Sequence, residues 1–293
     1  MFEKSILEVQ QFTRPILSVM RTYENVLAAN AATLFFVNEV GVAVTCKHVA
    51  EILIIASNQI WNKFENFKTE LRNNPETIQI LEQKYGYSSD VTVQILTTFQ
   101  NCFDTLSGYD VITHPTLDIA IIKFKGFNRT LYSSFAKFIS ADFVFNTGKF
   151  LCRLGYPFPE FTNFRVNPAN NNLEWTQEGN QLTPPFPIEG MFTRLVAENG
   201  AITGIELSTP GLRGQSGGPL FDNNGFIYGM QSQTMHLHLG FDMKDKEVQT
   251  DFGKATISNY PFLHVGRCVH ASQIVQFLIA NQVKTYQVSN VVT

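Results

Sequence analysis

A serine surrounded by glycines is the feature that most constrains this chain. It lies in the segment Gly211–Leu220. One residue separates Ser216 from Gly214, and two further glycines follow Ser216 directly. Glycine is used where the backbone turns sharply or approaches another group closely. If the amides of Gly214 and Ser216 point at one spot, the Ser216 hydroxyl can attack a carbonyl there while both amides stabilise the oxyanion. A Gly/Pro-rich hairpin turn without chemistry is the alternative.

Two other polar residues stand at the ends of apolar strands. His48 directly follows a predicted β-hairpin over residues 32–46. Asp118 opens a predicted strand over residues 118–124, where a carboxylate is costly to bury unless it is hydrogen-bonded or paired. A histidine N–H is a suitable donor to such a carboxylate. Taken singly, however, each is more ordinary, with His48 a structural histidine and Asp118 an acid that caps a turn.

The rest of the chain predicts many short strands with helices at both ends. Strand patterns cover residues 90–96, 109–112, 149–155, 192–195, 202–207 and 264–270, and a hairpin covers 223–232. Helices are expected at residues 13–28, with Thr13 as N-cap, and at 271–281. A helical insertion is expected between them, because Ile60, Phe64, Phe67 and Leu71 recur at helical spacing and a second short helix follows at 75–84. Short strands with Gly, Asn and Pro turns indicate closed antiparallel β architecture.

Composition narrows the class of protein. The chain has 293 residues, of which 44% are hydrophobic and 16% charged, so it can form two lobes with real cores. A net charge of -3 gives no reason to expect nucleic acid as a partner. No apolar run approaches the roughly 18 residues of a membrane span, so no membrane association is expected. The N-terminus mixes charged with apolar residues, unlike a signal peptide, and we therefore expect a cytoplasmic protein.

Four cysteines could form two disulfides in a secreted protein, namely Cys46, Cys102, Cys152 and Cys268. Because nothing else indicates export, we expect reduced and mostly buried thiols. Cys46 and His48 are also a close pair of residue types that bind zinc. No second close pair accompanies them, so we expect no metal and no other cofactor.

The three candidates occur in the order His48, Asp118, Ser216, which is the order of the chymotrypsin-type triad. The segment 35–49 is similar to the strand, turn and Thr-x-x-His-Val sequence of that family. Asp118-Ile-Ala-Ile-Ile-Lys and the Gly-x-Ser-Gly-Gly-Pro-Leu sequence ending at Leu220 are similar to two further family motifs. Over roughly residues 30–280, leaving out the helical insertion, the chain thus resembles trypsin-like serine peptidases of the chymotrypsin fold.

Two departures point toward the intracellular, high-temperature-requirement-like branch of that family. Val49 stands where the secreted enzymes carry a cysteine after the catalytic histidine. Gln215 stands where zymogen-type enzymes carry an aspartate that pairs with a newly cut N-terminus, so activation by that ion pair is not expected. The PDZ domain that usually follows the protease in this branch is expected to be missing.

The resemblance implies a mainly β fold of two antiparallel β-barrels. We expect an N-terminal helical segment over residues 1–30 and a first barrel over 31–145, with the helical insertion at 50–85. A second barrel with a C-terminal helix is expected over 146–283, followed by a tail over 284–293.

The resemblance also implies a role for each site residue. Ser216 would attack the scissile carbonyl, His48 would take and return the proton, and Asp118 would fix the imidazole tautomer. The amides of Gly214 and Ser216 would form the oxyanion hole.

Substrate binding is expected along the segment after the serine loop, where Ser232, Gln233 and Thr234 would pair with the substrate backbone as an added strand. Pro210 stands six residues before Ser216, where trypsin-like enzymes place an acid on the floor of the specificity pocket. A preference for Arg or Lys is therefore not supported, and a neutral or apolar side chain is expected.

The sequence thus predicts a serine endopeptidase that hydrolyses protein or peptide substrates through an acyl-enzyme. The alternative is a protease-fold binding or regulatory module, inactive or active only when a partner orders the oxyanion loop. In either case the helical insertion could hold a regulatory protein partner.

Overall fold

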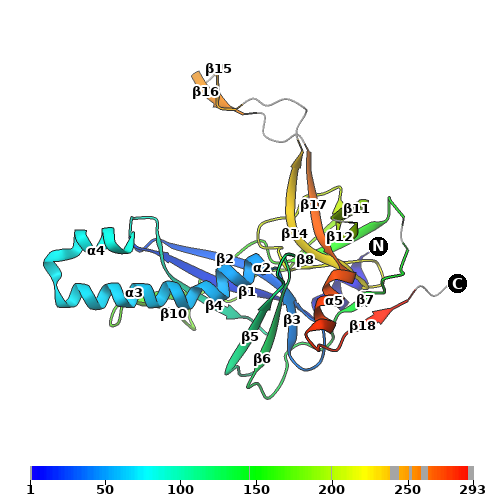
Figure 1. Cartoon of the computed structure of the whole chain (residues 1–293), viewed down its shortest axis with the longest axis horizontal. Coiled ribbons are helices and arrows are strands. Elements are labelled where there is room, and N and C mark those ends of the chain that lie inside the picture. The colour runs from blue at the N-terminus through cyan, green and yellow to red at the C-terminus, as the bar shows by residue number, and fades with distance from the viewer. Residues whose placement is uncertain are drawn as a thin grey trace.

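Two large β-sheets contain most of the strands in the described part of the computed structural model (Figure 1). The structure describes residues 2–144, 146–198, 200–237, 244–250, 253–258 and 263–289. The first sheet has six antiparallel strands in the order β4, β1, β2, β3, β6, β5. Their bounds are β1 Thr13–Thr22, β2 Leu27–Phe36, β3 Val42–Thr45, β4 Thr92–Phe99, β5 Gly108–Thr113 and β6 Ala120–Lys125.

The second sheet has eight strands in the order β13, β8, β11, β12, β17, β14, β7, β18. An additional pairing of β13 with β14 closes six of them into a ring. Their bounds are β7 Lys137–Ile139, β8 Phe150–Gly155, β11 Phe186–Glu198, β12 Ala201–Leu207, β13 Pro219–Phe221, β14 Ile227–Leu237, β17 Leu263–His270 and β18 Tyr286–Val288. Two small hairpins add β9 Phe164–Asn167 with β10 Asn172–Trp175, and β15 Lys246–Thr250 with β16 Gly253–Ile257.

The predicted mainly β, two-barrel architecture of the chymotrypsin type is confirmed. The second barrel closes through the β13–β14 pairing. The first stays a half-barrel, because its edge strands β4 and β5 do not pair with each other within the described part of the chain. The helices are α1 Glu3–Gln10, α2 Lys47–Ala50, α3 Ala56–Asn73, α4 Ile78–Tyr85 and α5 Ala271–Ala280, with a π-helical turn at Glu51–Ile55 and a 3-10 turn at Pro75–Thr77.

The helix expected at residues 13–28, with Thr13 as its N-cap, is wrong. These residues form β1 and the start of β2, and the N-terminal helix is α1 instead. β1 lies between β2 and β4, and both of its faces are covered: Ile16 enters the main core, whereas Leu17 and Val19 pack in a separate cluster under the β9–β10 hairpin. A strand buried on both faces has no alternating pattern, so its apolar residues can match a helical spacing by coincidence. The first sheet therefore begins at Thr13 rather than near residue 31.

The helical insertion forms a hairpin in which α3 runs alongside β4 of the first sheet, and α4 lies at the far end from the second sheet (Figure 1). The predicted apolar face is confirmed at Phe64 and Phe67, which are buried with Leu81 and Tyr87 in a small core of their own. This core reaches the first sheet through Val93 of β4 and through Tyr23, whose ring stacks on that of Tyr87.

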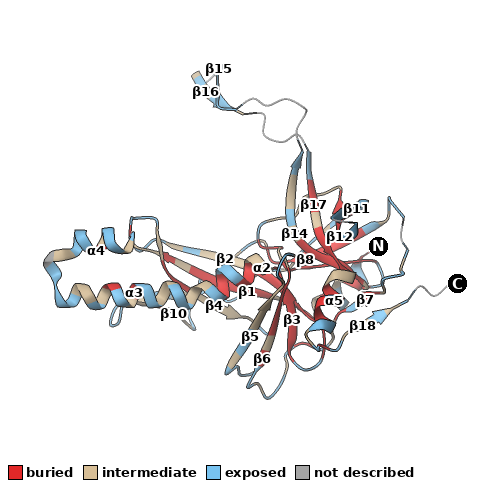
Figure 2. Ribbon diagram, in the orientation of Figure 1, coloured by how far each residue is buried: buried red, intermediate tan, exposed pale blue. Residues whose placement is uncertain are grey.

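The main core runs continuously through both lobes, and its buried positions lie along the central strands and α5 (Figure 2). Phe36 shows the tightness of this packing. It is fully buried, and its ring stacks on Tyr132 with 3.8 Å between the ring centroids. The four cysteines are buried and free, as expected of reduced thiols. No helix in the described residues is long and apolar enough to cross a membrane.

Truncation of Phe36 should therefore be far more costly than truncation of a surface phenylalanine. We expect Phe36→Ala to lower the free energy of unfolding by about 3–5 kcal/mol, because it leaves a cavity that the surrounding rings cannot fill. Phe150→Ala is the control, since Phe150 is 49% exposed in β8. Urea denaturation of both variants checks this, and equal losses for the two would contradict the assigned core.

Candidate active site

The three predicted catalytic residues lie at the junction of the two sheets. His48 stands in the first turn of α2, directly after β3, and Asp118 lies just before β6. Ser216 lies in the loop before β13. The backbone N–H of Thr33 in β2 donates to the carbonyl oxygen of Ser216 at 3.0 Å, which ties the serine loop to the first sheet.

His48 and Asp118 are held together by three contacts. Both carboxylate oxygens of Asp118 lie within hydrogen-bond distance of the His48 Nδ1 atom, at 3.0 and 2.9 Å. The backbone N–H of His48 also donates to Asp118 at 3.0 Å. A carboxylate at Nδ1 favours the tautomer that carries its proton there, which leaves Nε2 free to accept one.

The charge of Asp118 is stabilised by its donors. Burial by itself raises the pKa of this carboxyl group, since it removes solvent from the charged form. Hydrogen bonds from the His48 ring, the Ser232 hydroxyl and the His48 amide outweigh that effect and lower the pKa of Asp118 to about 2. Asp118 is therefore ionised at neutral pH.

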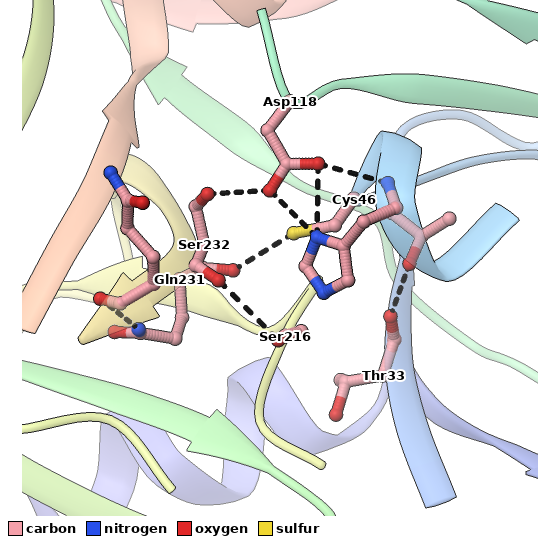
Figure 3. A network of polar contacts seen from close by, with 9 residues as sticks. Thr33, Cys46, Asp118, Ser216, Gln231 and Ser232 are labelled. Carbon is pink, nitrogen blue, oxygen red and sulfur yellow. Dashed lines mark hydrogen bonds and ion pairs between the residues drawn. The ribbon is translucent and has the colours of Figure 1, made fainter. Parts of the chain in front are cut away.

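Ser232 contributes more than the substrate pairing that the sequence indicates. Its hydroxyl donates to Asp118 Oδ2 at 2.5 Å, and its carbonyl oxygen accepts from the Ser216 hydroxyl at 3.4 Å (Figure 3). The pairing of β14 with β17 shifts register between Gln231 and Gln233, so Ser232 is the extra residue of a β-bulge. Bulges commonly re-aim a side chain beside an active site. No motif in the sequence marks this position.

The Ser216 hydroxyl is thus linked to Asp118 through Ser232. Within the described residues it makes no hydrogen bond to the His48 ring, and its acceptor is the Ser232 carbonyl oxygen. Catalytic hydrogen bonds are often long or misaligned before substrate binds. The structure therefore brings the three predicted residues into one cluster, with the serine hydroxyl turned toward β14.

The serine loop allows no side chain at its glycines. Gly214 has φ +96°, and a Cβ there would lie 2.6 Å from the Tyr156 carbonyl oxygen. The Thr33 hydroxyl fixes the same residue by donating to the Gly214 carbonyl oxygen at 2.9 Å. Among the described residues, neither the Gly214 nor the Ser216 amide donates to a protein acceptor. Both predicted oxyanion-hole amides are therefore available to a ligand.

Gln215 supports the loop from within. It is fully buried, and its side-chain oxygen accepts from the Leu212 amide at 3.0 Å while its Nε2 donates to the Phe186 carbonyl oxygen at 3.0 Å. Gln215 therefore makes neutral hydrogen bonds at the position where zymogen-type enzymes carry an ion-pairing aspartate. Like Thr33, Gln215 is a supporting residue whose contacts cannot be read from the sequence.

The predicted substrate-binding residues lie on two facing segments. Ser232, Gln233 and Thr234 belong to β14, and Pro210 precedes the serine loop. The Thr234 hydroxyl accepts from the Gly211 amide at 3.0 Å and donates to the Gly211 carbonyl oxygen at 2.9 Å. These contacts connect β14 to the residue next to Pro210.

A cavity of about 460 Å³ opens beside His48 and Asp118. Its walls include Leu117 from the first lobe, and Gln233 and Arg267 from the second. A larger cavity of about 1000 Å³, between α1, β1 and residues 180–185, is lined by none of the three predicted catalytic residues. The smaller cavity therefore adjoins two of the three predicted catalytic residues, whereas Ser216 is not among its lining residues.

Cys46, His48 and Asp118 offer ligand atoms within 4.8 Å of one another. Each of these three groups already makes a hydrogen bond to another residue. The Cys46 thiol donates to the Gln231 carbonyl oxygen at 3.1 Å, and burial raises its pKa, so it stays neutral. A neutral thiol is a poor ligand, and we assign no metal to this cluster.

The low pKa of Asp118 makes a testable contribution to stability. The group ionises more readily in the folded chain, with a pKa of about 2 against an ordinary 3.8, so it stabilises the fold above pH 3.8 and loses this effect as pH falls toward 2. We expect the pH-dependent part of the difference in unfolding free energy between the natural chain and Asp118→Asn to reach about 2 kcal/mol at pH 7. Urea titrations between pH 7 and pH 3 measure it.

The control for this prediction is Asp110→Asn, because Asp110 is an exposed partner of Lys125 on β5. The Asp110 variant should follow the natural chain at each pH. A difference for Asp118→Asn that stays constant down to pH 3 would contradict the assigned hydrogen bonds.

Comparison with solved structures identifies the fold. The HtrA-type protease AlgW with a decapeptide aligns over 96% of this chain and 67% of its own, with 10% identity and a TM-score of 0.52. The Rv3671c protease from M. tuberculosis, in its active form, aligns over 96% of this chain and 86% of its own, with 11% identity and a TM-score of 0.48. No protein-family model and no curated protein sequence matches this chain. The chain thus has the two-lobed fold of trypsin-like serine proteases.

Proposed function

We propose that this protein is a serine endopeptidase that hydrolyses peptide bonds through an acyl-enzyme on Ser216. The observation that carries the proposal is the cluster of His48, Asp118 and Ser216 beside two amides that have no protein acceptor among the described residues. A histidine oriented by a carboxylate, a nearby hydroxyl and an oxyanion hole are the parts that acyl transfer requires.

The reaction proceeds in two halves. The Ser216 oxygen attacks the carbonyl carbon of the scissile bond, and its proton passes to His48 Nε2. Before this step the hydroxyl rotates away from the Ser232 carbonyl oxygen. The amides of Gly214 and Ser216 stabilise the oxyanion, and His48 then protonates the leaving amine as the C–N bond breaks. Water, deprotonated by His48, hydrolyses the ester and releases Ser216.

Asp118 acts through His48. Its carboxylate holds the ring at Nδ1 and stabilises the imidazolium that forms in each half-reaction, without taking the proton itself. The Ser232 hydroxyl keeps Asp118 ionised and in place. Both are positioning residues for the histidine.

A protein or peptide substrate would bind along β14. Gln233 and Thr234 pair with β17, and no other strand in the described residues pairs with them, so a substrate strand could be added there. The Gln231 side chain, which donates to the Gln233 carbonyl oxygen at 3.0 Å, would give up that contact when the strand binds. The complex of the structurally similar AlgW with a decapeptide supports a peptide ligand here. A cytoplasmic location and a regulatory partner on the helical insertion stay predictions.

Replacement of the nucleophile tests the proposal directly. We expect Ser216→Ala to reduce hydrolysis of a casein substrate by roughly 10⁴-fold or more, because triad members act as a unit. A fluorophosphonate probe should label the natural chain and leave the variant unlabelled, with equal melting temperatures for both. Failure of the natural chain to label under any condition would favour the alternative of a binding or regulatory module.

The oxyanion hole can be tested by substituting two glycines that have nearly the same φ angle. Gly214→Ala places a Cβ 2.6 Å from the Tyr156 carbonyl oxygen, which displaces the Gly214 amide. We expect kcat to fall by about 10²–10³-fold. Gly148→Ala is the control, since Gly148 has φ +95° but nothing within 4 Å of its added Cβ. The proposal is contradicted if both variants lose the same activity.

A further inference from the structure

A buried guanidinium lies within the second barrel. Arg153 of β8 is 0% exposed, the largest fully buried side chain described. Its two terminal nitrogens donate to neutral oxygens, to Gln231 Oε1 at 2.9 Å and to Thr209 Oγ1 at 2.6 Å. Its Nε atom is buried without a partner, and no described carboxylate forms an ion pair with it.

Such an arrangement is costly for a folded protein. A buried charge is usually paired, because desolvation without a counter-charge is strongly unfavourable. Burial lowers the pKa of Arg153, but arginine remains charged in proteins. The guanidinium is therefore a positive charge in low dielectric that lacks an anionic partner.

The close neighbours of two glycines show where the Arg153 guanidinium lies. A Cβ added at Gly266 of β17 would lie 2.3 Å from an Arg153 terminal nitrogen and 2.6 Å from the Thr209 carbonyl oxygen. Thr209 adjoins Pro210, the residue expected at the floor of the specificity pocket. A Cβ added at Gly211 would lie 2.3 Å from Gln231 Nε2, so the amide that holds Arg153 lies directly against the serine loop.

We propose that this site selects an acidic side chain, Asp or Glu, on the amino-terminal side of the cleaved bond, with Arg153 as the charge that recognises it. The inference rests on the proposed peptidase function and replaces the expectation of a neutral or apolar side chain.

The polar groups between Arg153 and the serine loop favour a carboxylate. In this proposal the incoming side chain passes between β14 and the serine loop, where it parts the two hydrogen bonds that join Thr234 to Gly211. A carboxylate accepts hydrogen bonds only, so it can replace the Thr234 hydroxyl as acceptor for the Gly211 amide and for the donors beyond it. An apolar side chain would leave that amide without a partner, and a lysine or arginine would be repelled by Arg153.

The experiment compares inhibitors that differ in one side chain. Four peptidyl diphenyl phosphonates, with Glu, Gln, Leu or Lys side chains at the reacting position, are incubated with the full chain, and the rate of Ser216 modification is followed by mass spectrometry. Glu and Gln have nearly the same shape, so their ratio isolates the charge. We expect Glu to react at least about tenfold faster than Gln, and faster than Leu and Lys.

Arg153→Met keeps most of the side-chain volume and removes the charge. We expect the Glu-to-Gln ratio to fall to about one in this variant. Arg165→Met is the matched control, because Arg165 is an exposed arginine on the β9–β10 hairpin, and its ratio should equal that of the natural chain. If Arg153→Met does not fold, the Glu-to-Gln ratio of the natural chain alone decides whether an acidic side chain is preferred.

The outcomes separate the two proposals. Ser216 modification with equal rates for Glu and Gln, or with Leu or Lys fastest, overturns the acidic preference and keeps the peptidase. A natural chain that reacts neither with the four phosphonates nor with a fluorophosphonate overturns both. A high Glu-to-Gln ratio that survives in Arg153→Met also overturns the assignment to Arg153.

Discussion

The site depends on the hydrogen bonds to the half-buried carboxylate of Asp118. It stands in the first lobe, yet one of its donors, the Ser232 hydroxyl, belongs to β14 of the second. The other donors come from the ring and amide of His48. Because a carboxylate at this depth is tolerable only when its donors are in place, the alignment of the two lobes and the orientation of the histidine are coupled.

The serine loop is fixed by close packing against β2. A Cβ at Gly217 would lie 2.0 Å from the Thr33 carbonyl oxygen, and the Thr33 hydroxyl and amide bind the carbonyl oxygens of Gly214 and Ser216. The glycines around the serine thus have a physical reason beyond turn formation. They let the loop of one lobe lie directly on a strand of the other, so the amides of Gly214 and Ser216 are positioned by the first sheet.

These contacts explain how far the sequence could be interpreted. The order and local context of His48, Asp118 and Ser216 sufficed to predict the cluster, because each residue sits at a strand end or in a glycine loop with its own pattern. The strand at residues 13–22 was not predictable in this way, since burial on both faces removes the alternation that identifies strands. Ser232 was predicted only as a substrate-binding residue, because a bulge leaves no periodic signal that would indicate its contacts with Asp118 and Ser216. Arg153 was not predicted at all, because its pairing with neutral side chains leaves no sequence pattern.

The bulge at Ser232 connects the predicted catalytic residues with the buried Arg153. Gln231 and Ser232 are consecutive, but the side chain of Gln231 binds Arg153 inside the second barrel, and that of Ser232 binds Asp118 between the lobes. The Gln231 carbonyl oxygen also accepts from the Gly217 amide at 2.9 Å, next to Ser216. One short stretch of β14 therefore contacts the histidine's carboxylate partner, the serine loop and the buried cation. Under the two proposals, recognition of a substrate carboxylate at Arg153 would act on the same strand that contacts the serine loop, and β14 would thereby connect binding with catalysis.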